Sequence, residues 1–117
     1  MENPIRLVYF NAHGRADAIR MLLAHAKVEY ENKIINSEEW MQGDIKKEMA
    51  LGQAPLMNID GKSLIQSMAI LRFIGRKYGY YPEDAYQAYL VDLIMDAQGD
   101  YINEYAKFYF AKDNKEK

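Results

Sequence analysis

The amino-acid sequence predicts an α/β domain with a mixed four-stranded sheet, followed by one long helix. Three features of the 117-residue chain predict this arrangement. The chain starts with a strand–helix–strand order, and an Asp60-Gly61 turn separates two short apolar runs in its middle. After Pro82, a stretch of about 30 residues has helical periodicity throughout.

The first three elements are a strand over residues 5–10, a helix over residues 16–26 and a strand over residues 28–35. The first strand is a short apolar run with β-branched and aromatic members, which is typical of a buried strand. The helix is predicted by apolar residues at helical spacing, which are Ile19, Leu22, Leu23 and Ala26. A strand, a helix and a strand in this order favour a parallel pair joined by a right-handed crossover.

Four more elements are predicted in the next part: an irregular helix over residues 40–51 that starts near Ser37, strands over 55–59 and 62–65, and a helix over 66–78. The Asp60-Gly61 pair is a strong hairpin signal, because both residues tolerate positive φ angles. Gly79 is expected to end the last of these helices in a left-handed cap. The order β-α-β, loose helix, β-β-α is that of a thioredoxin-like domain.

The long C-terminal helix is predicted over residues 83–112, where Gly99 is the only helix breaker. A helix of ~30 residues is ~45 Å long, whereas a domain of ~80 residues has a radius of gyration of ~12 Å. The helix therefore needs a further partner. We expect residues 1–79 to form the α/β domain, and residues 80–117 to form a linker and the first helix of a second, all-α domain.

Bulk composition excludes several classes of function. The net charge is -2, with basic and acidic residues scattered along the chain, which argues against nucleic acid as a partner. The sequence contains no cysteine, so sulfur chemistry needs a sulfur that a ligand brings. No apolar run approaches the ~20 residues of a membrane span, and no signal peptide is visible. We therefore expect a cytoplasmic protein that does not bind a membrane.

Ordered motifs run through these elements. They are Leu7-Val8-Tyr9-Phe10-Asn11, Gly14-Arg15-Ala16-Asp17, Ile19-Arg20, Trp40, Gly52-Gln53-Ala54-Pro55, Ile59-Asp60-Gly61, Gln66-Ser67-Met68-Ala69-Ile70-Leu71 and Lys77-Tyr78-Gly79. Single pieces are common, whereas the ordered set at these spacings is specific. With this set the chain resembles the cytosolic glutathione transferase family. A tyrosine that ends the first strand is similar to the tyrosine-type classes, of which sigma is preferred.

The resemblance implies two catalytic residues, Tyr9 and Arg15. The Tyr9 hydroxyl would donate a hydrogen bond to the sulfur of bound glutathione and favour the thiolate, which is the nucleophile. From the strand pattern alone, Tyr9 is an ordinary strand aromatic. Arg15 would add positive potential near the ligand; otherwise it is an exposed charge in a first turn, where an acidic residue suits the helix dipole better.

The resemblance also implies a glutathione-binding set that comprises Tyr9, Arg15, Trp40, Lys46, Gly52, Gln53, Ala54, Pro55, Gln66, Ser67 and Asp100. The bond before Pro55 is expected to be cis, so that Ala54 offers its backbone N–H and C=O to the cysteinyl part of glutathione. Gln66 and Ser67 open a helix, where the γ-glutamyl carboxylate would bind; Ser67 also suits a plain cap.

Trp40 and a nearby lysine would hold the glycyl end of glutathione. The resemblance favours Lys46, although Lys47 stays an alternative, and Trp40 also suits simple hydrophobic packing. An acidic stripe follows one face of the long helix, with members at Asp92, Asp96, Asp100 and Glu104. One helix face does not surround a metal ion, so no metal is expected. Asp100 matches an acid that reaches a neighbouring subunit's glutathione amine; such a stripe is otherwise a solvated face.

The resemblance leaves two functions open. One is a glutathione transferase that activates the glutathione thiolate for attack on small electrophiles, or a related isomerase or peroxidase, acting as a homodimer. The other is an inactive or weakly active binding or assembly module, as in the crystallins that reuse this fold. The chain stops after the first helix of the family's second domain, which favours the module, whereas the retained site residues favour the enzyme.

Overall fold

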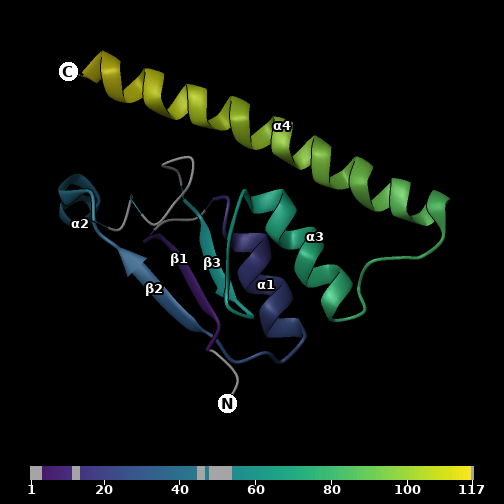
Figure 1. Ribbon diagram of the computed structural model, residues 1–117. Coiled ribbons are helices and arrows are strands. Elements are labelled where there is room, and N and C mark those ends of the chain that lie inside the picture. The colour runs from purple at the N-terminus through teal and green to yellow at the C-terminus, as the bar shows by residue number, and fades with distance from the viewer. Residues whose placement is uncertain (1–3, 12–13, 45–46, 48–53, 117) are drawn as a thin grey trace. The chain divides into compact units, whose positions relative to one another are not determined.

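The structure is a computed structural model that describes residues 4–11, 14–44, 47 and 54–116 (Figure 1). The chain divides into two compact units, Met1–Tyr80 and Tyr81–Lys117. The first unit holds a mixed four-stranded sheet, and the second holds one long helix. The predicted α/β fold class is therefore confirmed.

The sheet has the strand order β2-β1-β3-β4. Its strands are β1 (Arg6–Phe10), β2 (Glu31–Ile35), β3 (Leu56–Ile59) and β4 (Lys62–Ile65). β1 runs parallel to β2 and antiparallel to β3, which in turn runs antiparallel to β4. The hairpin between β3 and β4 turns at Asp60 (φ 52°) and Gly61 (φ 75°). Both φ angles are positive, as a two-residue hairpin turn of this handedness requires.

One face of the sheet carries the main core, under the helices α1 (Asp17–His25) and α3 (Ser67–Lys77), which lie side by side (Figure 1). Its buried residues are Leu7, Ala16, Ile19, Leu23, Met57, Ile59, Ile70 and Ile74. Burial of each large aliphatic side chain contributes roughly 1.5–3 kcal/mol. Tyr9 packs against this cluster, because side chains alternate along β1 and Tyr9 follows Leu7 onto the same face.

The opposite face carries a smaller cluster under α2 (Ser37–Gln42). Val8, Ile35 and Leu56 are buried there, and Phe10 and Trp40 pack against them. The rings of Phe10 and Trp40 meet edge to face with centroids 5.1 Å apart. Trp40 therefore ties α2 to the sheet.

Several element ends differ from the sequence-based expectation. Residues 28–30 do not join β2, because Lys27 (φ 57°) is in the left-handed region and Val28 N donates to Leu23 O to close α1. α2 starts at Ser37 as expected, with Asn36 as its N-cap, but it already ends before Gly43, whose φ is 85°. Most of the expected stretch over residues 43–51 lies outside the described residues.

The second unit contains α4 (Ala85–Glu116), which runs through Gly99 as predicted. Its first turn is capped by Asp84, whose Oδ2 accepts from Gln87 N at 3.0 Å, and Pro82 lies in the linker before the helix. Large apolar side chains remain exposed along it, namely those of Tyr86, Tyr89, Leu90, Leu93, Ile94, Tyr101, Tyr105 and Phe108. Within the described ranges, no helix is long and apolar enough to cross a membrane.

Candidate functional site

The sheet topology brings the chemically interesting residues to one end of the sheet. The register pairs Phe10 with Ile35 and Val8 with Leu56, and it pairs Leu56 with Ile65. The C-terminal ends of β1, β2 and β4 therefore meet the start of β3. The segments that follow β1 and β4 lead directly into α1 and α3, so the positive ends of both helix dipoles lie at this end as well.

Tyr9 lies near the end of β1, with its hydroxyl oxygen held by the backbone. Its Oη accepts a hydrogen bond from Arg15 N at 3.2 Å. Among the described residues, no group accepts a hydrogen bond from this hydroxyl. The Tyr9 O–H is therefore positioned by one partner and has a proton to offer to a ligand.

Gly14 forms the wall beside this hydroxyl. A Cβ atom at Gly14 would lie 2.9 Å from Tyr9 Oη, closer than real Cβ atoms approach an oxygen. The Gly14 amide is itself held, because it donates to Asp17 Oδ2 at 3.1 Å. Gly14 and Arg15 thus lie directly against the phenol hydroxyl.

The contact that the structure shows between Arg15 and Tyr9 is made by the Arg15 backbone, not by its guanidinium. A different cation faces the phenol ring, since the guanidinium carbon of Arg20 lies 5.6 Å from the Tyr9 ring centroid. The sequence patterns assigned no role to Arg20. The signal was present: Arg20 falls at helical spacing among the buried residues Ala16, Ile19 and Leu23, where a charge is unusual.

The peptide bond between Ala54 and Pro55 is cis, as predicted. Pro55 is buried and directly precedes β3, while Ala54 is half-buried and packs against the smaller cluster. These residues therefore start β3 at the end of the sheet where Tyr9 lies. Gly52, Gln53 and Lys46, which belong to the predicted glutathione set, lie outside the described residues.

Gln66 and Ser67 connect β4 to α3. Gln66 has φ 74° and ψ 111°, which is unusual for a residue with a side chain. Such a conformation costs of order 1–3 kcal/mol and points to function where the surroundings maintain it. Ser67 is the first residue of α3, and it is 8% exposed. Both residues lie where the free backbone N–H groups of α3 are available to an anion.

α2 is anchored by its cap and by an ion pair. Asn36 Oδ1 accepts from Glu39 N at 2.7 Å, and Lys33 Nζ lies 3.0 Å from Glu39 Oε2. The hydrogen bond from Lys33 lowers the pKa of the Glu39 carboxyl. Trp40 is half-buried, so hydrophobic packing accounts for part of its surface only. Lys47, the alternative to Lys46, is exposed and lies 3.9 Å from Asp44.

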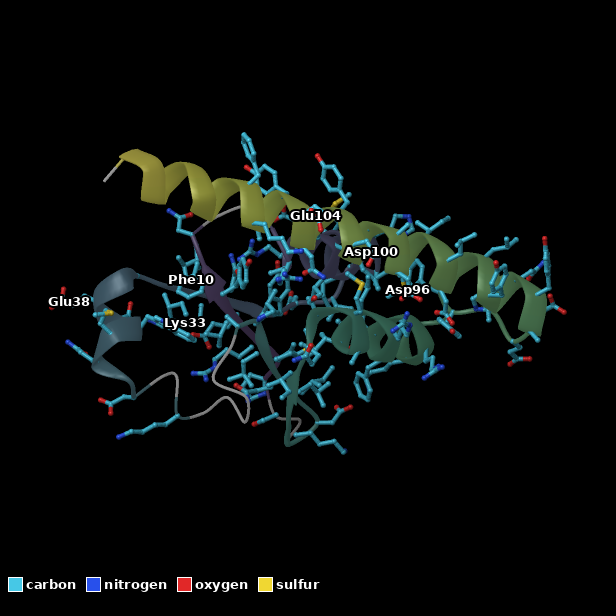
Figure 2. The ribbon with its side chains drawn as sticks, turned by 90° about the horizontal axis from the view of Figure 1, so that it is seen from above. Phe10, Lys33, Glu38, Asp96, Asp100 and Glu104 are labelled. Carbon is cyan, nitrogen blue, oxygen red and sulfur yellow. The ribbon has the colours of Figure 1, made fainter. Side chains whose placement is uncertain are left out.

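The acidic stripe belongs to the second unit. Figure 2 shows Asp96, Asp100 and Glu104 along α4, and all three are exposed. Asp92 is not simply solvated, because Tyr81 Oη donates to both of its carboxylate oxygens at 3.0 Å. In the part of the chain that the structure describes, no three acidic or histidine residues group as metal ligands do.

The strand order, the cis bond before Pro55 and the helix starts around Tyr9 together define a thioredoxin-like domain. Residues 5–76 match the family model for the N-terminal domain of glutathione S-transferase. The chain therefore belongs to the glutathione S-transferase family.

Known relatives agree with this assignment. The chain is 34% identical over 104 residues to glutathione S-transferase P 1 of Bufo bufo, covering 89% of this chain and 50% of that protein. It is 38% identical over 108 residues to S-crystallin SL11 of Nototodarus sloanii, and the match covers 92% of this chain and 52% of that protein. The crystal structure of monomeric Na-GST-3 from the hookworm Necator americanus superposes with a TM-score of 0.78 at 39% sequence identity. The match covers 87% of this chain and 49% of that chain. The chain thus spans about half the length of the curated relatives it matches.

Proposed function

We propose that this chain is the glutathione-binding part of a glutathione transferase, in which Tyr9 activates the thiol of glutathione. The observation that carries the proposal is the Tyr9 hydroxyl, whose oxygen is held by Arg15 N at 3.2 Å while its proton remains available. A free thiol has a pKa of ~8.5, so little of it is thiolate near neutral pH. A fixed donor that bonds better to the anion lowers that pKa and raises the nucleophilic fraction.

The reaction then needs few groups from the protein. The thiol proton leaves to solvent, and the thiolate attacks the electrophilic carbon. The new carbon–sulfur bond forms as a leaving group departs from that carbon with its bonding electrons. In an addition, the electron pair of the attacked double bond instead moves to an atom that takes a proton from solvent. The Arg15 N–H polarises the Tyr9 hydroxyl by donating to its oxygen, and the positive charge of Arg15 favours an anion at this end of the sheet. Isomerisation and peroxide reduction use the same activated thiolate.

The tripeptide itself is assigned to the residues around the open end of the sheet. Ala54, next to the cis bond to Pro55, offers its backbone groups to the cysteinyl unit as an added strand does. The γ-glutamyl carboxylate binds at Gln66 and Ser67, at the start of α3. The glycyl end is assigned to Trp40 and to Lys46, with Lys47 as the alternative, and Gly52 and Gln53 complete the binding set. Asp100 binds the glutathione amine of a second subunit in a homodimer, and the protein acts in the cytoplasm.

A second function is favoured by one finding. The chain is 38% identical to an S-crystallin over 108 residues, so a binding or assembly module without turnover is the alternative. Both functions require the fold. Only the transferase requires that Tyr9 change the ionisation of a bound thiol.

The test is a titration of glutathione bound to the parent chain and to Tyr9→Phe, following the ultraviolet absorbance of the thiolate. Binding is followed separately by the fluorescence of Trp40, which is the only tryptophan in the sequence. We expect Tyr9→Phe to keep the binding and to raise the pKa of the bound thiol by at least about one unit, which is the effect of losing one good donor.

Binding with the same thiol pKa in both chains would support the assembly module and reject the role of Tyr9. No binding at millimolar glutathione would reject the transferase and any glutathione-binding module. A suitable control is Tyr101→Phe, because Tyr101 is exposed on α4 and belongs to no part of the proposed site.

A further inference from the structure

Arg20 is a charged residue on the core-facing side of α1. Its side chain is only 21% exposed, although Arg is rarely buried unless it is paired. Ala16, Ile19 and Leu23, which flank it at helical spacing, are at most 1% exposed. Solubility alone therefore does not explain why an arginine occupies this largely covered position on α1.

Three groups hold the Arg20 guanidinium in place. Its carbon lies 5.6 Å from the Tyr9 ring centroid. Nε donates to Asn32 Oδ1 at 3.3 Å, and Nη1 lies 3.5 Å from Asp17 Oδ1. Asn32 pairs with Leu7 in the sheet, so it lies on the same face as Tyr9. The guanidinium therefore sits over the phenol ring, between α1 and the outer strand.

Asp17 connects this cation to the loop that holds the Tyr9 hydroxyl. One of its carboxylate oxygens faces Arg20, while the other accepts from Gly14 N at 3.1 Å. Gly14 is the residue next to Arg15, whose N–H donates to Tyr9 Oη. The ring and the hydroxyl of Tyr9 are thus held by one connected set of residues.

A cation within about 6 Å of an aromatic ring face is attracted to its electrons. The attraction grows when negative charge develops on the ring oxygen, as it does when the hydroxyl donates strongly to an anion. The Asp17 carboxylate offsets part of this effect, but one of its oxygens also accepts from the Gly14 amide.

We propose that Arg20 is a positioning residue for the thiol chemistry, which acts through the face of the Tyr9 ring and strengthens the hydrogen bond that Tyr9 donates to the bound sulfur. The inference rests on the proposed function of Tyr9, and it adds a second, ring-facing cation to the loop contact from Arg15. Arg20 itself does not touch the ligand.

The first test is a double-mutant cycle on the titration of bound glutathione, using the chains Tyr9→Phe, Arg20→Met and the double variant. Arg20→Met should raise the pH at which the bound thiol ionises by about half a unit, with glutathione affinity nearly unchanged. In the Tyr9→Phe background, the same replacement should have no further effect, because the hydroxyl through which Arg20 acts is gone. Arg20→Lys keeps the charge and should restore part of the effect.

A purely structural role predicts a different result, namely lower thermal stability without a shift in the thiol titration. Lys62→Met is the matched control, since Lys62 is an exposed cation on β4. An Arg20→Met titration equal to that of the parent would overturn the proposal. So would a shift of equal size in the parent and in the Tyr9→Phe background.

The second test needs no glutathione, so it separates a failure of this inference from a failure of the proposed function. Tetranitromethane nitrates the phenolate form of tyrosine, and mass spectrometry reports the rate at each site. Tyr9 should nitrate about threefold more slowly in Arg20→Met than in the parent, relative to the exposed Tyr101. An unchanged relative rate would contradict the inference even if glutathione binds; a slower rate would support it even if glutathione does not bind.

Discussion

At the scale of single residues, the room around the Tyr9 hydroxyl depends on Gly14. A Cβ atom at this position would approach Oη to 2.9 Å, so either the phenol or the loop has to move by several tenths of an ångström. We predict that Gly14→Ala lowers the kcat/KM for conjugation of a simple electrophile about tenfold, because small misplacements of a catalytic group are costly. Steady-state kinetics at neutral pH measures this effect.

The matched control for Gly14→Ala is Gly99→Ala. Gly99 lies within α4 and has nothing within 4 Å of an added Cβ. Alanine is favoured over glycine inside a helix by roughly 0.5–1 kcal/mol, so this variant should keep its activity and unfold at a slightly higher temperature. Equal activities of both variants would show that Gly14 does not position the phenol.

How far the sequence predicts the candidate site differs from residue to residue. The position of Tyr9 near the end of β1 was predictable from a short apolar run, whereas the cis bond before Pro55 was predicted only through the family resemblance, because an X-Pro bond is seldom cis in general. The place of Arg20 was not predicted, because its contacts are with Tyr9 of β1 and Asn32 of β2. These contacts between elements cannot be read from the sequence of α1 alone. Likewise, the backbone contact of Arg15 depends on the path of the loop rather than on residue type.

At the scale of the elements, α2 depends on its N-cap. Asn36 Oδ1 accepts from Glu39 N at 2.7 Å, and Glu39 Oε1 accepts from Asn36 N at 3.4 Å. We predict that Asn36→Ala costs about 1 kcal/mol of unfolding free energy, whereas Asn36→Ser keeps most of it because serine also caps well. Urea unfolding followed by circular dichroism measures both variants. Equal losses in the two variants would mean that the cap itself contributes nothing.

The ion pair between β2 and α2 predicts a pH dependence. The hydrogen bond from Lys33 lowers the pKa of Glu39 from its ordinary value of 4.5. The pair therefore stabilises the fold above that value, and its contribution is lost as the pH falls through the lowered pKa of the folded chain. Lys33→Met should have a lower melting temperature than the parent near neutral pH, and the difference should disappear in acid.

Lys47→Met is the control for this prediction. Lys47 Nζ and Asp44 Oδ1 are 3.9 Å apart, and both side chains are largely exposed. Water screens their attraction, so this ion pair contributes little to the stability of the fold. Its melting temperature should follow that of the parent at every pH. A Lys33→Met difference that persists below the range in which Glu39 titrates would point to lost packing by the lysine stem.

The same elements show why helix and strand ends were predicted less well than their order. Apolar periodicity located α1, α3 and α4, and the Asp60-Gly61 turn placed β3 and β4 correctly. The early end of α2 and the late start of β2 depend on two residues with left-handed backbone conformations, Gly43 and Lys27. A lysine in that conformation leaves no clear mark on the sequence, because it is stabilised by the helix-end hydrogen bond from Val28 to Leu23.

At the scale of the whole molecule, the two units differ in what holds them together. Among the residues that the structure describes, every member of the two core clusters lies between Ile5 and Tyr78. The second unit has a single helix, and a lone helix gains little stability without a packed apolar face. The first unit therefore contains what a domain needs to fold, whereas the second unit does not.

We predict that residues 1–80 alone unfold cooperatively and still bind glutathione, because Tyr9, Ala54, Pro55, Gln66 and Ser67 all belong to this part. Glutathione at about one hundred times its dissociation constant should stabilise this fragment by about 2.7 kcal/mol, which raises the melting temperature of so small a domain by roughly 10–20 °C. Differential scanning calorimetry with and without glutathione measures both the cooperativity of unfolding and the stabilisation.

S-methylglutathione is the control, because its sulfur cannot ionise. It should stabilise the fragment nearly as well as glutathione, since the rest of the tripeptide is unchanged and only the bond from Tyr9 is lost. A fragment that melts without a cooperative transition would show that residues 81–117 complete the fold. A fragment that unfolds cooperatively but is not stabilised by glutathione would show that an essential part of the binding site lies beyond Tyr80.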